Sequence, residues 1–200
     1  WTADFAKNEG TIVYQIRQGV HWAQPNTDAG RLMAGRELTA DDVAFNFVRN
    51  ILTPGSTINR SNIELRTATA TKTGPWEVTV KTSVAGLMSG VSRFSDANVM
   101  YPPDVIKKYG NMQDWRNSVG TGPYHFTDYV PGSTVTLVRN PAYWQKDPIG
   151  PGKGNQLPYL DTVKYIGIPD LSTRMAALRT AKIDESSSLF LSEALQLRKV

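Results

Sequence analysis

The chain has 200 residues, of which 40% are hydrophobic and 20% are charged, and it contains no cysteine. This composition is that of a globular protein of one domain or two small ones, and the lack of cysteine excludes thiol catalysis, disulfide scaffolds and the common structural zinc sites. The net charge of +4 is small and the basic residues are scattered, which argues against a nucleic-acid-binding protein.

No stretch approaches the roughly 18 consecutive apolar residues of a transmembrane helix, so we expect no membrane-spanning segment in this chain. The sequence begins at Trp1, with neither an initiator methionine nor the pattern of a signal peptide. We therefore expect a trimmed or processed chain rather than a natural start.

The first predicted elements are extended. Alternating apolar and polar residues predict a strand at 11–17, and a second extended piece follows at 20–22. Residues 23–37 contain Pro, Asn, Asp and Gly, which favour turns and predict a loop.

A helix is predicted to begin at residue 40. Thr39 is its expected N-cap, because Asp41 and Asp42 follow in the first turn, where the helix dipole favours negative charge. Its apolar stripe is expected to comprise Ala44, Phe47, Val48 and Ile51. The two aspartates point about 100° apart on such a helix, so they predict capping rather than a pair of catalytic carboxylates.

An antiparallel strand pair is predicted next, at 63–71 and 76–82. Short helices are predicted at 86–94 and at 103–109. The polar stretch 111–119 is expected to be a surface connection that separates two subdomains.

The second part begins with the clearest prediction in the sequence, a hairpin with strands at 124–130 and 134–139. Residues 140–158 are rich in proline and glycine and predict a loop, followed by a strand at 161–168.

Two helices are predicted near the end of the chain. Ser172 is the expected cap of a helix at 173–181, residues 182–184 suggest a return toward the sheet, and Ser192 begins the last helix.

The sequence predicts no catalytic residue, metal site or cofactor site. His21 and His125 lack zinc-site spacing and no nucleophile elbow accompanies them; His125, in the middle of the hairpin, is expected to point to solvent. The glycine-rich segments 120–122 and 150–154 miss essential residues of the dinucleotide and phosphate loops, and are interpreted as tight turns. Most of the five tryptophans are expected in the core, with a minority lining a ligand surface.

Several motifs occur in a fixed order along nearly the whole chain. Residues 120–144 contain Gly-Thr-Gly-Pro-Tyr, Asp-Tyr-Val-Pro-Gly and Arg-Asn-Pro-Ala-Tyr-Trp; Leu-Thr-Ala-Asp-Asp-Val lies upstream at 38–43, and Ala-Leu-Arg-Thr-Ala-Lys-Ile-Asp downstream at 177–184. Together they resemble the bacterial extracellular solute-binding proteins of the peptide- and nickel-binding family, which deliver ligands to ABC importers. This family usually has Gly where the chain has Ala181.

The resemblance implies a mixed α/β (α+β) fold, a periplasmic-binding-protein-like lobe fragment with a mixed sheet plus a family-specific extra domain. Residues 1–117 would form the extra domain and 118–200 part of the first ligand-binding lobe, with the second lobe beyond Val200. The implied function is that of a non-enzymatic substrate-binding component that captures peptides, nickel complexes or a similar solute. The alternative is a protein–protein interaction domain without small-ligand binding.

The implied partners are the solute and the membrane subunits of the importer, with no nucleic acid. The implied location is the periplasm or the cell exterior, with or without a lipid anchor. In peptide-binding relatives the acidic residue that pairs with the ligand's amino terminus belongs to the second lobe, so no residue here inherits that role. Ser186, Ser187 and Ser188, in the polar run that follows Asp184, are the candidate ligand-binding residues.

Overall fold

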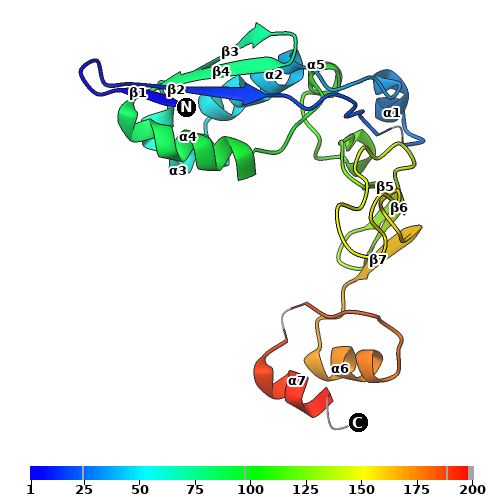
Figure 1. Ribbon diagram of the computed structural model, residues 1–200. Coiled ribbons are helices and arrows are strands. Elements are labelled where there is room, and N and C mark those ends of the chain that lie inside the picture. Colours follow the sequence, from blue (N-terminus) through cyan, green and yellow to red (C-terminus); the bar gives the residue numbers. More distant parts are fainter. Residues whose placement is uncertain (24, 97, 188, 198–200) are drawn as a thin grey trace. The chain divides into compact units, whose positions relative to one another are not determined.

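The computed structural model describes residues 1–23, 25–96, 98–187 and 189–197 (Figure 1). The chain divides into two compact units: the first comprises Trp1–Thr127 and Leu137–Thr162, and the second comprises Asp128–Thr136 and Val163–Val200. Helices and strands occur in both parts of the chain, which confirms the predicted mixed α+β class.

A four-stranded antiparallel sheet forms the centre of the first unit. Its strands are β1 (Thr2–Asp4), β2 (Glu9–Gln15), β3 (Thr69–Gly74) and β4 (Glu77–Thr82), in the order β1-β2-β4-β3. Alternate residues of the central strands enter the core, because Ile12 pairs with Val80 and Tyr14 with Val78 in the β2–β4 register. The predicted strand 63–71 is shorter than expected: η1 (Ile63–Leu65) is a 3-10 turn that places Leu65 in the core.

The helices α2 (Ala40–Leu52) and α4 (Val84–Asp96) pack against the sheet, and α3 (Thr57–Ser61) packs against α2 (Figure 1). The predicted N-cap of α2 is confirmed, because Thr39 and Asp42 form a capping box. The predicted apolar stripe of α2 is correct for Phe47 and Ile51, which are buried. Ala44 and Val48 are only half-buried, and Val43 is buried in their place.

Two polar residues explain the shifted stripe of α2. Asn46 is fully buried, donates from Nδ2 to the Tyr101 carbonyl at 2.8 Å, and accepts from the Tyr101 amide at 2.8 Å. Asp42 is also buried, so α2 presents a second, polar contact face toward the segment that leads into α5 (Pro103–Tyr109). The pattern of apolar residues in the sequence does not reveal this polar contact face.

An aromatic cluster closes the core between the sheet and the helices. The rings of Phe47 and Phe94 lie 4.4 Å apart between centroids, and Tyr14 meets Phe47 edge-on at 5.2 Å. The Tyr14 hydroxyl donates to the Gly90 carbonyl at 2.9 Å, which gives the polar end of this half-buried ring a partner.

The predicted loop at 23–37 contains a helix, α1 (Asp28–Met33), and in this respect the prediction was wrong. Thr27 is its N-cap and accepts from the Gly30 amide at 3.1 Å, so residues interpreted as turn formers begin a helix instead. Gly30 is required by close packing, because a Cβ at this position would lie 2.1 Å from the Pro25 carbonyl oxygen. Met33 is buried and anchors the helix.

The segment after α5 is more structured than a surface connection. Gly110 ends α5 as a residue with φ 79°, and η2 (Trp115–Asn117) forms a 3-10 turn. Val119 is 1% exposed, so the polar stretch predicted to lie on the surface ends in the core.

The predicted hairpin is confirmed by β5 (Tyr124–Val130) and β6 (Thr134–Arg139), and β7 (Thr162–Ile166) completes a three-stranded sheet in the order β5-β6-β7. Residues 140–158 form the predicted loop, held together by an isolated bridge between Lys146 and Gln156. His125 does not point freely to solvent: it is half-buried, its Nδ1 has no hydrogen-bond partner, and burial lowers its pKa.

Two helices, α6 (Leu171–Arg179) and α7 (Leu191–Leu197), follow in the second unit. Asp170 caps α6 by accepting from the Thr173 amide at 2.7 Å, so the predicted cap, Ser172, lies inside the helix. Residues 182–184 form bends rather than a strand. None of the helices in the described residues is both long and apolar enough to cross a membrane.

The end of α6 bears on the family resemblance. Ala181 has φ 51°, and the amides of Ala181 and Lys182 donate to the carbonyls of Leu178 and Ala177 at 3.2 and 2.8 Å. This hydrogen-bond pattern is a Schellman motif, in which the left-handed position is ordinarily glycine. The helix therefore ends as a glycine-terminated helix would, with an alanine in the strained position.

Candidate functional site

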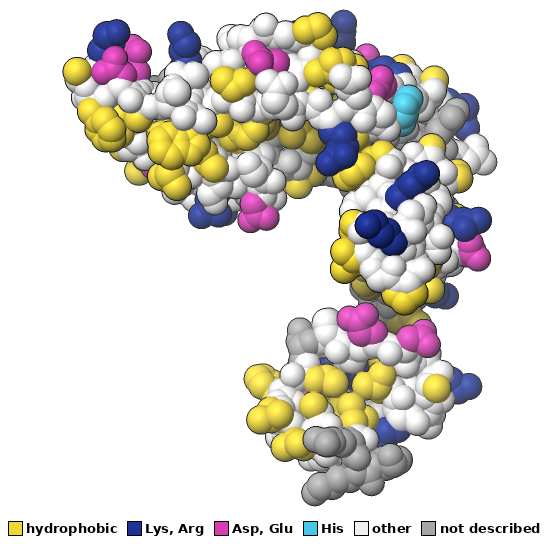
Figure 2. Space-filling view, in the orientation of Figure 1, with side chains coloured by type: hydrophobic (Ala, Val, Ile, Leu, Met, Phe, Trp, Pro, Cys, Tyr) yellow, Lys and Arg dark blue, Asp and Glu magenta, His cyan; other side chains and the backbone are white. Residues whose placement is uncertain are grey.

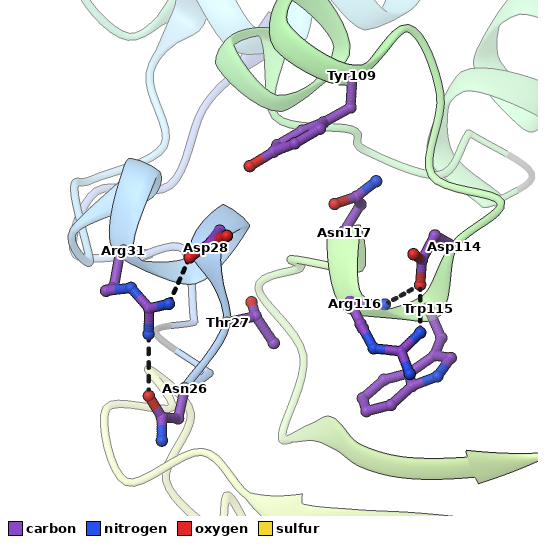
Figure 3. A pocket seen from close by; sticks show the side chains of 9 residues that line it. All are labelled: Asn26, Thr27, Asp28, Arg31, Tyr109, Asp114, Trp115, Arg116 and Asn117. Atoms are coloured by element: carbon purple, nitrogen blue, oxygen red, sulfur yellow. Dashed lines mark hydrogen bonds and ion pairs between the residues drawn. The ribbon is translucent and has the colours of Figure 1, made fainter.

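A pocket of about 500 Å³ lies in the first unit, between the start of α1, the end of α5 and η2 (Figure 3). This volume falls within the roughly 300–1,000 Å³ of typical ligand sites. Nine residues line it: Asn26, Thr27, Asp28, Arg31, Tyr109, Asp114, Trp115, Arg116 and Asn117.

One wall of the pocket is built by the first turn of α1. Asp28 and Arg31 are three residues apart on this helix and form an ion pair across one turn. The guanidinium of Arg31 also donates from Nη1 to Asn26 Oδ1 at 3.1 Å, so it is held from two sides.

The opposite wall is built by η2. Asp114 caps this turn by accepting from the Arg116 amide at 3.0 Å, and Arg116 returns to the same carboxylate through Nη1 at 3.3 Å. The Arg116 guanidinium lies 4.9 Å from the centroid of the Trp115 ring, which is a cation–π contact. Tyr109, the last residue of α5, extends over the space between the two walls (Figure 3).

The pocket carries two acidic and two basic side chains, and each acid is paired with a base on its own wall. All four are well exposed, with fractions between 51% for Asp114 and 76% for Asp28, so these pairs are weak and exchangeable. Such a surface can bind a polar ligand through charge-assisted hydrogen bonds. It presents no nucleophile activated by a base, and within the described residues no cluster of His, Asp and Glu could hold a metal ion.

An ion-pair network outside the pocket lining connects α5 to α2 through Arg36. Arg36 donates from Nη1 and Nη2 to both carboxylate oxygens of Asp42, at 2.8 and 2.7 Å, and from Nη2 to Asp104 at 2.7 Å. Burial alone would raise the pKa of Asp42, but the hydrogen bonds from Arg36 and from the Thr39 amide outweigh it and hold that pKa below its ordinary value. Asp42 is thus a cap and an anchor, while Asp41 pairs with Lys72 at the surface.

The serines proposed from the sequence lie in the second unit, apart from the residues of this pocket in the chain. Ser186 is half-buried and its hydroxyl donates to the Ser187 carbonyl at 3.4 Å, whereas Ser187 is exposed. Ser188 lies outside the described residues. Their role in ligand binding stays a prediction.

The tryptophans differ from expectation. Only Trp22, at 1% exposure, belongs to the buried core; Trp76, Trp115 and Trp144 are half-buried and Trp1 is largely exposed. Sequence reasoning missed the pocket because it assigned both walls to loops. The signals were nevertheless present: a threonine followed by an Asp–Arg pair three residues apart, and an aspartate two residues before an arginine.

The pattern of charge agrees with the prediction from composition. On the face shown in Figure 2, acidic and basic side chains are interspersed over the first unit, without a broad patch of one sign. A nucleic-acid-binding surface would gather its basic residues together.

Comparison with known proteins identifies a family that matches nearly the whole chain. The model of the bacterial extracellular solute-binding proteins, family 5 Middle, matches residues 4–199. The oligopeptide-binding protein AppA of Bacillus subtilis is 26% identical over 156 residues, which are 75% of this chain and 26% of AppA. A probable ABC transporter-binding protein of Deinococcus radiodurans is 25% identical over 193 residues, which are 88% of this chain and 30% of that protein.

A solved structure shows the same fold. The periplasmic binding protein DppA of Helicobacter pylori, in complex with the peptide STSA, has a TM-score of 0.70 at 23% identity, covering 100% of this chain and 39% of DppA. The chain thus spans between about a quarter and two fifths of the length of these relatives. The family model covers nearly every residue, and the chain belongs to the bacterial extracellular solute-binding proteins of family 5.

Proposed function

We propose that the full-length protein is the substrate-binding component of an ABC importer and captures peptides or a similar solute outside the cytoplasmic membrane. The observation that carries this proposal is the family match over residues 4–199. The names of AppA as an oligopeptide-binding protein and of DppA as a peptide complex support peptides as the first ligand class to test.

We also propose that residues 1–117 form the extra domain and residues 118–200 part of a ligand-binding lobe. The four-stranded sheet with its aromatic cluster supports the first segment as the centre of a core, against which Val119 and Trp144 of the second segment pack. Figure 2 shows hydrophobic side chains gathered over α6 and α7, where Leu191 is 76% and Leu195 49% exposed. Exposed apolar surface of this kind supports the second segment as part of a larger lobe.

Ligand capture in this proposal is a binding equilibrium without chemistry. Two lobes close around the solute, and the closed state is favoured because it makes ligand contacts that the open state lacks. Ser186, Ser187 and Ser188 are proposed to contribute hydroxyls to the cleft, and the exposure of Ser187 supports its access to a ligand.

Calorimetric titration of the full-length protein with peptide and nickel-chelate libraries tests this function. Binding should raise the free energy of unfolding by about 2.7 kcal/mol at a free ligand concentration 100 times Kd. The bound peptide should be recovered intact, because the proposal includes no hydrolysis. Absence of any ligand-linked stabilisation across both libraries would favour the alternative, an interaction domain without small-ligand binding.

The serines are tested separately, by changing all three to alanine in the full-length protein. Peptide affinity should fall while the unfolding temperature without ligand stays the same. Unchanged affinity would remove these serines from the cleft and leave the importer function standing.

Cell fractionation with and without lipoprotein-processing inhibitors tests the location and the lipid anchor.

A further inference from the structure

We propose that the pocket of Figure 3 is a second ligand site, selective for a small zwitterion with a free ammonium and a free carboxylate group, such as a dipeptide. All nine lining residues belong to the first unit, so the site does not depend on the placement of the second unit. None of the serines assigned to the cleft is among the residues that line this pocket.

The arrangement of charge is what selects a zwitterion. The α1 wall presents Asp28 with Arg31, and the η2 wall presents Asp114 with Arg116. A guanidinium offers a planar fork of donors that matches a carboxylate, and an aspartate accepts from an ammonium group. Each wall can therefore receive either end of a ligand that carries both charges.

Ligands of a single sign fit this pocket less well. The four charges of the pocket sum to zero. A phosphate would therefore be attracted by two guanidinium groups but repelled by two carboxylates. A metal ion would be attracted by the carboxylates but repelled by the guanidinium groups. A zwitterion supplies one group of each sign: its ammonium can replace an arginine as the partner of one aspartate, and its carboxylate can replace an aspartate as the partner of one arginine. The exchange is easy because both ion pairs are exposed to water, with Arg31 60% and Arg116 65% exposed.

Uncharged groups in the pocket suit the middle of such a ligand. The Tyr109 hydroxyl and the Asn117 amide point into the space between the two walls (Figure 3). An amide side chain can both donate to and accept from a peptide group, and the half-buried rings of Tyr109 and Trp115 offer apolar surface to a side chain. A dipeptide uses all three kinds of contact, whereas a free amino acid lacks the peptide group.

The test requires a signal from the pocket itself. The full-length protein is labelled with 5-fluorotryptophan, the fluorine resonance of Trp115 is assigned by its loss in Trp115→Phe, and leucyl-glycine is titrated. The Trp115 resonance should shift saturably, and N-acetyl-leucyl-glycinamide, which lacks both charges, should bind about tenfold or more weakly. The shift should persist when Ser186, Ser187 and Ser188 are alanine, which separates this site from the proposed cleft.

Variants on both walls make the assignment specific. Arg116→Gln and Arg31→Gln should each weaken the Trp115 response by about tenfold. Arg139→Gln is the matched control, because Arg139 forms a similar exposed pair with Asp161 away from the pocket. Absence of a Trp115 shift, an equal shift with the blocked peptide, or a shift produced only by glucose or inorganic phosphate would overturn the proposal. An unchanged response in both arginine variants would do the same.

Discussion

The Arg36 network offers the sharpest test of how the first unit is held together. Arg36→Met keeps most of the aliphatic stem and removes the guanidinium that binds Asp42 and Asp104. Asp42, whose side chain is 4% exposed, is then left with the Thr39 amide at 2.9 Å as its main partner. Removing one member of a buried ion pair costs about 3–5 kcal/mol. Because Arg36 is itself 36% exposed and the Thr39 hydrogen bond remains, we expect about 2–3 kcal/mol.

Urea unfolding of the full-length protein measures this loss, and the first unit can be followed separately by amide hydrogen exchange in α2 and α5. Arg139→Met is the matched control, since its pair with Asp161 is exposed on both sides and should contribute less than about 1 kcal/mol. Arg36→Met combined with Asp42→Asn should recover part of the loss, because the unpaired buried charge is gone.

The pH dependence gives a second readout. The pKa of Asp42 is lower in the folded protein than in the unfolded chain. The stability that this ionised carboxylate contributes is therefore present above the unfolded-state pKa and is lost as pH falls through the folded-state pKa. The difference between wild type and Arg36→Met should therefore shrink below about pH 4. A cost equal to that of the Arg139 control, or no recovery in the double variant, would refute this account of Asp42.

Three further substitutions test local features in the same full-length protein. Ala181→Gly should stabilise the end of α6 by about 1 kcal/mol, because it relieves φ 51°; slower hydrogen exchange in α6 would show this, and faster exchange would contradict it. Gly30→Ala should destabilise the first unit by about 1–3 kcal/mol in urea unfolding through the clash with Pro25, whereas Gly120→Ala, with no atom closer than 4.0 Å, should be nearly neutral. Phe47→Ala should cost about 3–5 kcal/mol by the same measurement, and a cost below 1 kcal/mol would mean that the aromatic cluster is not packed as described.

Local signals account for the elements that the sequence predicted well. The hairpin β5–β6 follows from strand alternation around a Pro-Gly turn, and α2 follows from a threonine cap with aspartates behind it. Both depend on residues within a few positions of one another, so one sequence is enough to find them. The same holds for the family motifs, which are contiguous.

Features that depend on distant residues were missed. The α1 helix is six residues long and is fixed by Met33 in the core and by the packing of Gly30 on Pro25, neither of which is visible in the local pattern. The pocket joins α1 to residues that lie about 80 positions later in the chain, and only tertiary packing brings them together. Trp115 lines that pocket, and the sequence, which predicted that a minority of the tryptophans would line a ligand surface, did not indicate which of them would do so.

The first unit is discontinuous in the chain, and this has a consequence for its folding. Its last part, residues 137–162, includes Trp144, which packs against the core, and emerges only after the tip of the hairpin has been made. A chain that ended at Thr127 would therefore lack Trp144, a packing partner of the first unit's core, so the fold of this unit is completed only when both of its chain segments are present.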